Sequence, residues 1–209
     1  RMLLRSGTAA LHVGAVDAGL DCLRRAAATA ETEDNPGLQA ETLVELGTAL
    51  IHSVRGLDDE GILHLKQAEA LAIQGQNRNA ACRAVIELAY VDALAGRRPD
   101  AATMAARALS LCDGDAALMA NAHGFAGFNL ADWGKYDEAA LAYESGLAAA
   151  GKAGVPRREG WIYGLAAWGW LRSGKLDLAA DWARQSVVIC DRLEWLAFRS
   201  WPETVLAEA

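Results

Sequence analysis

The chain has 209 residues, 53% of them hydrophobic, and a formal net charge of −7. This length and composition suffice for a single domain with a continuous core, predicted to span residues 1–209. Because the lysines and arginines form no stripe and the acidic surplus is spread along the sequence, the charge argues against direct nucleic-acid binding by this segment.

The reactive side chains form no recognisable site. The four cysteines lack any CxxC pair, so reduced and packed thiols are predicted for Cys22, Cys82, Cys112 and Cys190. The four histidines lack metal-ligand spacing, so neither a metal nor another cofactor is predicted. No nucleophile-elbow pattern occurs, which argues against an enzyme. Without a signal peptide or a long uncharged apolar stretch, the sequence predicts a cytoplasmic protein that does not enter the membrane.

Small residues recur at fixed distances from five glycines. Around Gly134 they stand seven residues before, at Gly127, and five and twelve residues after, at Ala139 and Gly146. The same offsets hold around the other four origin glycines, so all fifteen positions are small: the origins are Gly14, Gly56, Gly96 and Gly174. The origins are 42, 40, 38 and 40 residues apart, which leaves room for two helices and two turns per unit. The pattern therefore predicts an array of helical hairpins.

In chain order, this pattern predicts five hairpins and the start of a sixth, at about 1–35, 36–76, 77–114, 115–154, 155–196 and 198–209. The predicted helices of the first four hairpins cover about 2–13 and 17–32, 38–54 and 58–74, 79–95 and 99–112, and 116–133 and 136–152. Each origin glycine ends a first helix, because glycine adopts the left-handed conformation at little cost. A last helix is predicted to begin at Ser200, with Pro202 in its first turn.

Each second helix has a start signal three residues after the origin glycine. Four units have an aspartate there: Asp17, Asp59, Asp137 and Asp177. The third unit has Pro99 followed by Asp100, which suits a helix start equally well because the missing N–H of proline is not needed in the first turn.

The segment GKYDEAALAYESGL, residues 134–147, resembles the second half of a tetratricopeptide repeat. Ala139, Tyr143 and Gly146 match the alanine, the aromatic residue and the next small residue of that family, and Gly127 matches the small residue of its first helix. The other units keep the small positions but replace the aromatic by Leu23, Leu65, Ala105 and Ala183. The resemblance implies an all-α, right-handed superhelical solenoid of about five TPR-like hairpins, with a period near 40 residues that exceeds the ~34 typical of the family.

The family geometry implies that the concave face is lined by first-helix residues lying thirteen, ten, six, three and two before each origin glycine. The candidate ligand-binding residues selected in this way are Arg83, Tyr90, Asn121, Phe128, Asp132, Trp161, Trp168 and Arg172. Gly124 and Gly164 are expected to leave gaps between the aromatics, which predicts a groove for a peptide or a small apolar or sugar ligand. In the first two units the same offsets select mostly leucines. The alternative is that Trp161 and Trp168 only pack between units.

Long, alanine-rich repeats of this kind are similar to the sensor arms of large bacterial ATP-dependent transcription regulators of the LuxR and maltose-activator types. The P-loop and helix-turn-helix of such regulators are absent from these residues, and the chain begins at Arg1, so a fragment of a larger protein is predicted. The expected function is a non-catalytic interaction or effector-sensing module that binds a protein, a peptide or a small-molecule effector. The alternative is a structural scaffold that forms homo-oligomers, with Trp195 and Trp201 covering an exposed end.

Overall fold

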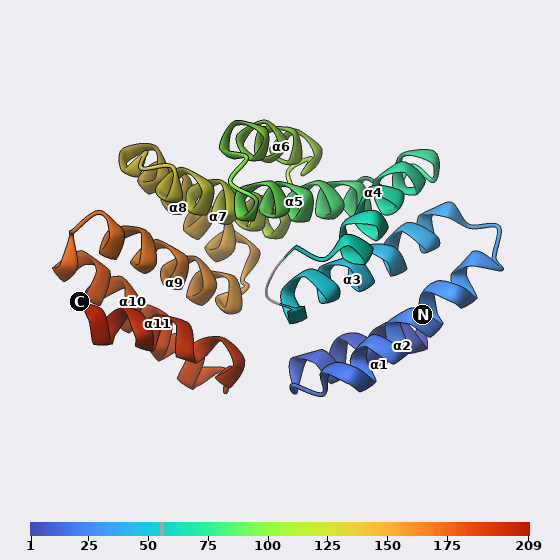
Figure 1. The fold of residues 1–209 in the computed structure, drawn as a ribbon, viewed down its shortest axis with the longest axis horizontal. Helices are drawn as coiled ribbons and strands as arrows, with labels where there is room; N and C mark the ends of the chain where they lie inside the picture. The colour runs from blue at the N-terminus through green and yellow to red at the C-terminus, as the bar shows by residue number, and fades with distance from the viewer. Residues whose placement is uncertain (55–56) are drawn as a thin grey trace. The chain divides into compact units, whose positions relative to one another are not determined.

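The computed structural model describes residues 1–54 and 57–209, and over these residues it consists of eleven α-helices and no strand (Figure 1). The all-α class predicted from the sequence is confirmed. The right-handed sense of a superhelix and its structural period stay predictions. The origin glycine Gly56 lies outside the described residues.

The helices alternate between first and second members of successive hairpins. Their bounds are α1 Met2–His12, α2 Val16–Glu31, α3 Pro36–Val54, α4 Asp59–Gln74, α5 Arg78–Leu94, α6 Arg98–Leu111, α7 Ala116–Asp132, α8 Tyr136–Ala153, α9 Pro156–Arg172, α10 Leu176–Arg192 and α11 Leu196–Glu208. Each helix predicted for the first four hairpins is present, and its bounds differ from the prediction by two residues at most.

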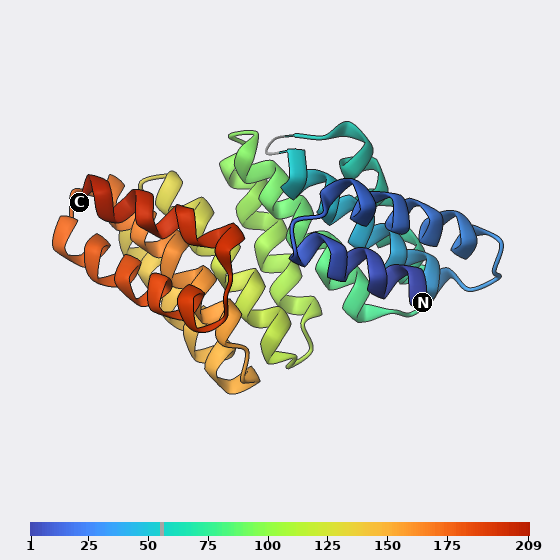
Figure 2. The same cartoon turned by 90° about the horizontal axis from the view of Figure 1, so that it is seen from below.

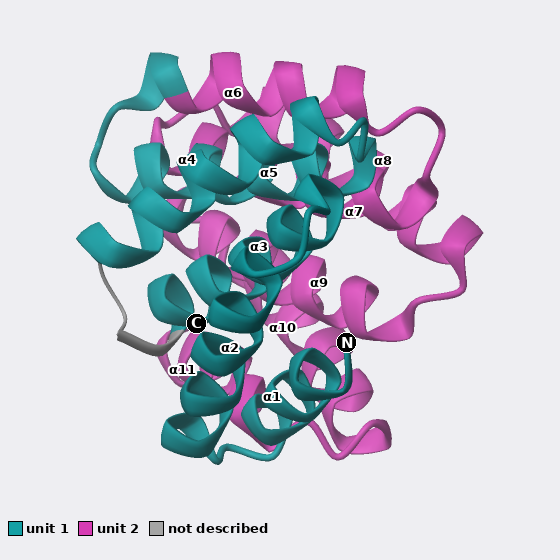
Figure 3. Ribbon diagram, turned by 90° about the vertical axis from the view of Figure 1, so that its right-hand side faces the viewer, with its two compact units in different colours: residues 1–100 teal, residues 101–209 magenta. Residues whose placement is uncertain are grey.

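The chain divides into two compact units, residues 1–100 (unit 1) and 101–209 (unit 2), which are described separately (Figure 3). In unit 1, helices α1 to α5 each pack against the next helix along the chain, and the first helices α1, α3 and α5 also contact one another in that order. In unit 2, α7 to α11 follow the same rule, with α7, α9 and α11 in contact (Figures 1 and 2). Each unit therefore stacks hairpins through its first helices. The expectation of a single domain stays a prediction.

The fifteen predicted small positions are all buried. A Cβ atom added at Gly127 would lie 2.6 Å from the ring of Tyr143, and one added at Gly7 would lie 2.8 Å from Leu23. Both distances are too short for a side-chain contact, so the small residues let paired helices approach closely. Ser186, the one polar member, donates a 2.7 Å hydrogen bond to the carbonyl oxygen of Gly160.

The described origin glycines have the predicted left-handed backbone. Their φ angles are +81° at Gly14, +76° at Gly96, +81° at Gly134 and +78° at Gly174. Non-glycine residues take this conformation in three of the turns that join one hairpin to the next: Gln76, Asp113 and Glu194 have φ angles of +52°, +52° and +51°. The repeated origin glycines therefore mark the turn between the first and the second helix of each hairpin.

The second helices begin at the predicted places, with their acidic residues in the first turn. Asp17, Asp59, Asp137 and Asp177 lie there, where a negative charge interacts favourably with the helix dipole. The side-chain cap of α4 is the preceding residue, Asp58, whose carboxylate accepts a 2.6 Å hydrogen bond from the backbone N–H of Gly61.

The second hairpin is packed in a register that differs by two residues from the sequence prediction. Leu65 lies nine residues after its origin glycine, as Tyr143 does, yet the small residue against it is Gly47, where an added Cβ would lie 2.8 Å from Leu65. Ala49, the predicted position, is buried as well. This hairpin therefore has two more residues between its close-packed small residue, Gly47, and α4 than the predicted register assumed.

This shift moves the leucines of α3 away from the surface where they were expected. Leu43, Leu46 and Leu50 belong to the buried core of unit 1 and do not line an exposed inner face. When Gly47 takes the place of the small residue seven before the origin, the offsets thirteen, six and two select Glu41, Thr48 and His52, which are partly or fully exposed.

The last helix begins earlier than predicted. Helix α11 starts at Leu196, four residues before Ser200, and Pro202 lies inside it. Glu194 adopts a left-handed conformation after α10, and the Trp195 ring stacks on Phe198 with centroids 4.7 Å apart, so the new helix is fixed directly after the turn. Pro202 is tolerated there although it cannot donate a hydrogen bond to the preceding turn.

Candidate functional site

The predicted site residues share one pattern of exposure. Positions thirteen, six and two before the origin glycine are at least partly exposed on α5, α7 and α9, whereas position ten is buried: Ile86, Gly124 and Gly164. The three exposed offsets differ by seven and four residues, so they lie on one side of a helix. We call this side the first-helix face of each unit. Arg83 and Tyr90 lie on it in unit 1, and the other six predicted residues lie on it in unit 2.

The two glycines expected to leave gaps are filled by aromatic rings of the next first helix. The Trp161 ring on α9 occupies the space that a side chain at Gly124 would need, and an added Cβ at Gly164 would lie 2.8 Å from the Phe198 ring on α11. Trp161 also meets Phe125 edge-on, with ring centroids 4.8 Å apart and planes at 74°. The expectation of open gaps is therefore wrong, and Trp161 packs between hairpins.

Two tryptophans pair on the first-helix face of unit 2. Trp168 on α9 and Trp201 on α11 have ring centroids 5.4 Å apart and planes inclined at 50°. Trp201 is 37% exposed, and its indole N–H donates a 3.0 Å hydrogen bond to the carbonyl oxygen of Gly164, which fixes the ring. Trp201 was not predicted to lie on this face, because residues 1–209 contain no origin glycine after α11 from which its offset could be counted.

The charged residues predicted on this face pair with each other. Arg172 on α9 forms an ion pair with Asp132 on α7, and its carbonyl oxygen accepts a hydrogen bond of 3.4 Å from the hydroxyl of Tyr136. Phe128 packs partly buried against the core of unit 2. The side-chain oxygen of Asn121 is buried and accepts no hydrogen bond within the described residues. The structure thus brings an ion pair and aromatic rings together along α7, α9 and α11.

The first-helix face of unit 1 carries polar pairs between α3 and α5. Arg83 forms an ion pair with Glu45 at 2.5 Å, and the Nε2 atom of His52 lies 2.9 Å from a carboxylate oxygen of Glu87. The His52 ring also stacks on Tyr90, with centroids 5.2 Å apart and planes within 5°. Burial, and next the negative charge of Glu87, raise the pKa of Tyr90.

His52 was missed because the offsets were counted in the wrong register, and Glu45 was missed because it stands at none of the offsets in either register. Asn77 adds another link to α3, since its amide donates a 3.1 Å hydrogen bond to Glu41. The signal that could have corrected the register was Gly47, a second small residue two positions before Ala49.

Within the described residues, the cysteines form no disulfide, and the histidine, cysteine and acidic side chains form no cluster that could hold a metal ion. Of the four cysteines, Cys82, Cys112 and Cys190 are buried. Burial raises the pKa of the Cys190 thiol, which makes it less nucleophilic at neutral pH. Within residues 1–54 and 57–209, no group of three His, Cys, Asp or Glu side chains could hold a metal ion. In the same ranges, no helix combines the length and apolar character needed to cross a membrane.

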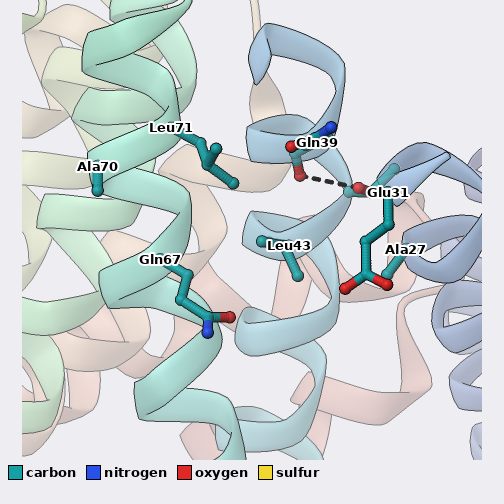
Figure 4. A pocket seen from close by; sticks show the side chains of 8 residues that line it. Ala27, Glu31, Gln39, Leu43, Gln67, Ala70 and Leu71 are labelled. Carbon is teal, nitrogen blue, oxygen red and sulfur yellow. Dashed lines mark hydrogen bonds between the residues drawn. The ribbon is translucent and has the colours of Figure 1, made fainter. Parts of the chain in front are cut away.

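Each unit also contains a hollow next to one of its first helices, α3 in unit 1 and α7 in unit 2. In unit 1 a hollow of about 340 Å³ lies between α2, α3 and α4 (Figure 4), lined by Ala27, Glu31, Gln39, Thr42, Leu43, Gln67, Ala70 and Leu71. In unit 2 a smaller one of about 170 Å³ lies between α6 and α7, lined by Ala102, Ala105, Ala106, Leu109, Ala126, Asn129 and Leu130. The hollow in unit 1 combines apolar and polar groups, whereas the one in unit 2 is lined almost wholly by aliphatic side chains.

Solved structures with the same arrangement of helices contain tetratricopeptide repeats or TPR-like repeats. The Signal Transduction ATPase with Numerous Domains from Pyrococcus horikoshii, which has a tetratricopeptide repeat sensor, gives a TM-score of 0.69 at 14% identity over 98% of this chain and 31% of that one. The nearly identical TPR-like repeats assigned to a kinesin light chain of Podosopora anserina give 0.62 at 15% identity, over 93% and 95% of the two chains.

The aspartyl phosphate phosphatase F of Bacillus subtilis gives a TM-score of 0.66 at 12% identity over 99% of this chain. The chain spans 57% of that phosphatase and 31% of the ATPase, so it corresponds to only part of each. No family model matches the sequence, and no curated protein is significantly similar to it. These likenesses concern the fold, and they show that the chain has the fold of a tetratricopeptide-repeat array.

Proposed function

We propose that the chain is a non-catalytic interaction or effector-sensing module, and that the first-helix face of unit 2 binds its peptide, protein or small-molecule ligand. The observation that carries this proposal is the pair formed by Trp168 and Trp201, two neighbouring aromatic rings that remain partly exposed in the folded chain. Monomeric proteins usually bury rings of this size, so partly exposed rings in contact favour a binding surface.

The surroundings of the pair suit ligand recognition. Trp201 is already fixed by its hydrogen bond to Gly164, so little side-chain entropy is lost when a ligand stacks on it. Arg172 lies four residues after Trp168, on the same side of α9, and its guanidinium keeps further N–H donors besides the one paired with Asp132. A ligand with an apolar or aromatic part and a nearby acceptor group fits this combination.

The parent protein is proposed to be a signalling ATPase or a bacterial transcription regulator of the LuxR or maltose-activator type. The likeness to the repeat sensor of the Pyrococcus horikoshii ATPase supports this assignment, because that region of the ATPase is described as its sensor. In such a parent, the chain would transmit the presence of the ligand to catalytic or DNA-binding domains outside residues 1–209.

The ligand-binding proposal is tested by titrating the purified chain with peptides selected from a random library and with candidate sugars while tryptophan fluorescence is recorded. A ligand that saturates the signal is expected to bind Trp168→Ala about fivefold more weakly, because a stacked ring contributes on the order of 1 kcal/mol. The matched control is Trp133→Ala, since Trp133 is also partly exposed but lies in the turn after α7. Unchanged binding to Trp168→Ala would contradict the proposal.

Self-association is the second candidate function. It is favoured by α11, which exposes Leu196 at 71% together with Trp201. Sedimentation at several protein concentrations tests it: a mass that rises with concentration, and that Leu196→Glu returns to the monomer value, is expected. A monomer at every concentration would rule this function out for residues 1–209.

A further inference from the structure

The hollow in unit 1 is a second candidate site, distinct from the first-helix face. It has a volume of about 340 Å³ and lies where two second helices, α2 and α4, meet α3 (Figure 4). Its apolar wall consists of Ala27 on α2, Leu43 on α3, and Ala70 and Leu71 on α4. The volume lies at the lower end of the range for small-ligand pockets, so the hollow can take a short aliphatic group.

The polar groups around the hollow are mainly hydrogen-bond acceptors. Glu31, near the end of α2, and Gln67 on α4 point their side chains toward it (Figure 4). Neither side chain forms a hydrogen bond or an ion pair within the described residues. The amide nitrogen of Gln39 donates a 2.7 Å hydrogen bond to the carbonyl oxygen of Glu33, which leaves the amide oxygen of Gln39 as an acceptor.

Thr42 contributes a further acceptor at the wall of the hollow. Its hydroxyl donates a 2.8 Å hydrogen bond to the carbonyl oxygen of Gln39, so its proton is used and its lone pairs remain. Among the lining residues Glu31 alone carries a charge, and no lining side chain is cationic. An anion would therefore be repelled by Glu31, and a purely apolar ligand would make no use of the carboxylate and amide oxygens.

We infer that this hollow binds a primary ammonium group on an aliphatic stem, belonging either to a free alkylamine or to a lysine side chain of a partner. An ammonium has three N–H donors and no acceptor, which complements Glu31 and the amide oxygens of Gln39 and Gln67. The stem packs against Leu43 and Leu71. Because Glu31 is exposed to solvent, its ion pair with the ligand is screened and the binding is weak. This inference is independent of the function proposed for unit 2.

The test uses the whole chain and two probes of the same shape, n-pentylamine and 1-pentanol, followed by NMR of the leucine methyl groups. Pentylamine is expected to shift the methyl signals of Leu43 and Leu71 in a saturable manner, and pentanol to bind more weakly. Glu31→Gln is expected to raise the dissociation constant of the amine about two- to fivefold, the effect of one exposed ion pair. Glu33→Gln, which removes the same charge two residues away, is the matched control and should leave the constant unchanged.

A second arm distinguishes the two sources of the ammonium group. Tighter binding of pentylamine than of a blocked Gly-Lys-Gly peptide supports a free amine as the ligand, and the reverse supports a partner lysine. Equal binding of amine and alcohol, equal weakening by Glu31→Gln and Glu33→Gln, or no saturable shift of the two leucines would each overturn the inference. Gln67→Trp, which fills the hollow from an exposed position, is expected to abolish the shift without unfolding the chain.

Discussion

The first helices of the two units have the same exposed positions but different chemistry. In unit 1 these positions and their neighbours form polar pairs between α3 and α5, such as Glu45 with Arg83 and His52 with Glu87. In unit 2 they carry aromatic rings, including Trp168 beside Trp201. The buried small positions are alike in both units. The fold is therefore maintained by one set of residues, and the chemistry of the exposed face can vary independently of it.

The largest expected effect concerns the buried position nine residues after the origin glycine, which is Leu65 in unit 1 and Tyr143 in unit 2. We expect this position to stabilise each unit in the same way. Tyr143→Ala is expected to destabilise the chain by about 3–5 kcal/mol and Leu65→Ala by about 2–5 kcal/mol, because both side chains are fully buried and truncation leaves a cavity. Urea unfolding followed by circular dichroism measures both. Leu141→Ala, at an exposed position of α8, is the control and should cost less than about 0.5 kcal/mol. A loss below 1 kcal/mol for either buried variant would contradict the shared role.

The next effect concerns the aromatic face of unit 2 alone. Gly124→Ala is expected to destabilise the chain by about 1–3 kcal/mol, because its methyl group would overlap the Trp161 ring. In a Trp161→Ala background the ring is absent, so the same substitution should cost less than about 1 kcal/mol. A double-mutant cycle by urea unfolding measures the difference. Equal costs in both backgrounds would show that Trp161 does not occupy the space beside Gly124.

The sequence predicted the packing positions well because their requirement is steric and local. A position between two helices in close contact accepts only Gly, Ala or Ser, and this restriction is visible in the residue types themselves. The left-handed turns at Gly14, Gly96, Gly134 and Gly174 were predictable for the same reason. Such features depend on the residue and its offset, and both are read directly from the sequence.

The candidate site was less predictable because it depends on contacts between helices. Gly124 was expected to leave a gap, since the sequence shows a missing side chain but not the Trp161 ring that fills its space. The register of α3 was missed because extra residues before a turn change every offset counted back from Gly56. The hollow beside Glu31 combines residues from three helices that share no offset, so no sequence pattern indicated it.

A smaller effect compares the ion pairs that link first helices in the two units. Asp132 with Arg172 in unit 2 and Glu45 with Arg83 in unit 1 are both partly exposed. Each pair is expected to show a coupling energy of about 0.5–1 kcal/mol in a double-mutant cycle with Asn or Gln for the acid and Gln for the arginine. High salt should reduce both energies. A coupling near zero in one unit only would show that the two faces differ in rigidity as well as in chemistry.

The smallest expected effect is a pH dependence that resides in unit 1. There Arg24 on α2 forms an ion pair with Glu60 on α4 at 3.2 Å, and the pair links two second helices. Hydrogen bonding to Arg24 outweighs the opposing effect of burial and holds the pKa of Glu60 below its ordinary value of 4.5. A lowered pKa gives stability that is present above that value and lost as pH falls through the folded pKa.

Arg24→Gln should therefore cost no more than about 0.5 kcal/mol at about pH 6, because both side chains are exposed, and less at about pH 3, because the ion pair is lost as the pH falls through the folded pKa of Glu60. Urea unfolding of the two proteins at both pH values measures this difference. Arg25→Gln, at the next position of α2, provides the control, since Arg25 pairs with Asp21 within its own helix. If the free energy of unfolding of Arg24→Gln stays below that of the unsubstituted chain by the same amount at low pH, Arg24 stabilises unit 1 through packing of its aliphatic stem and not through the charge of Glu60.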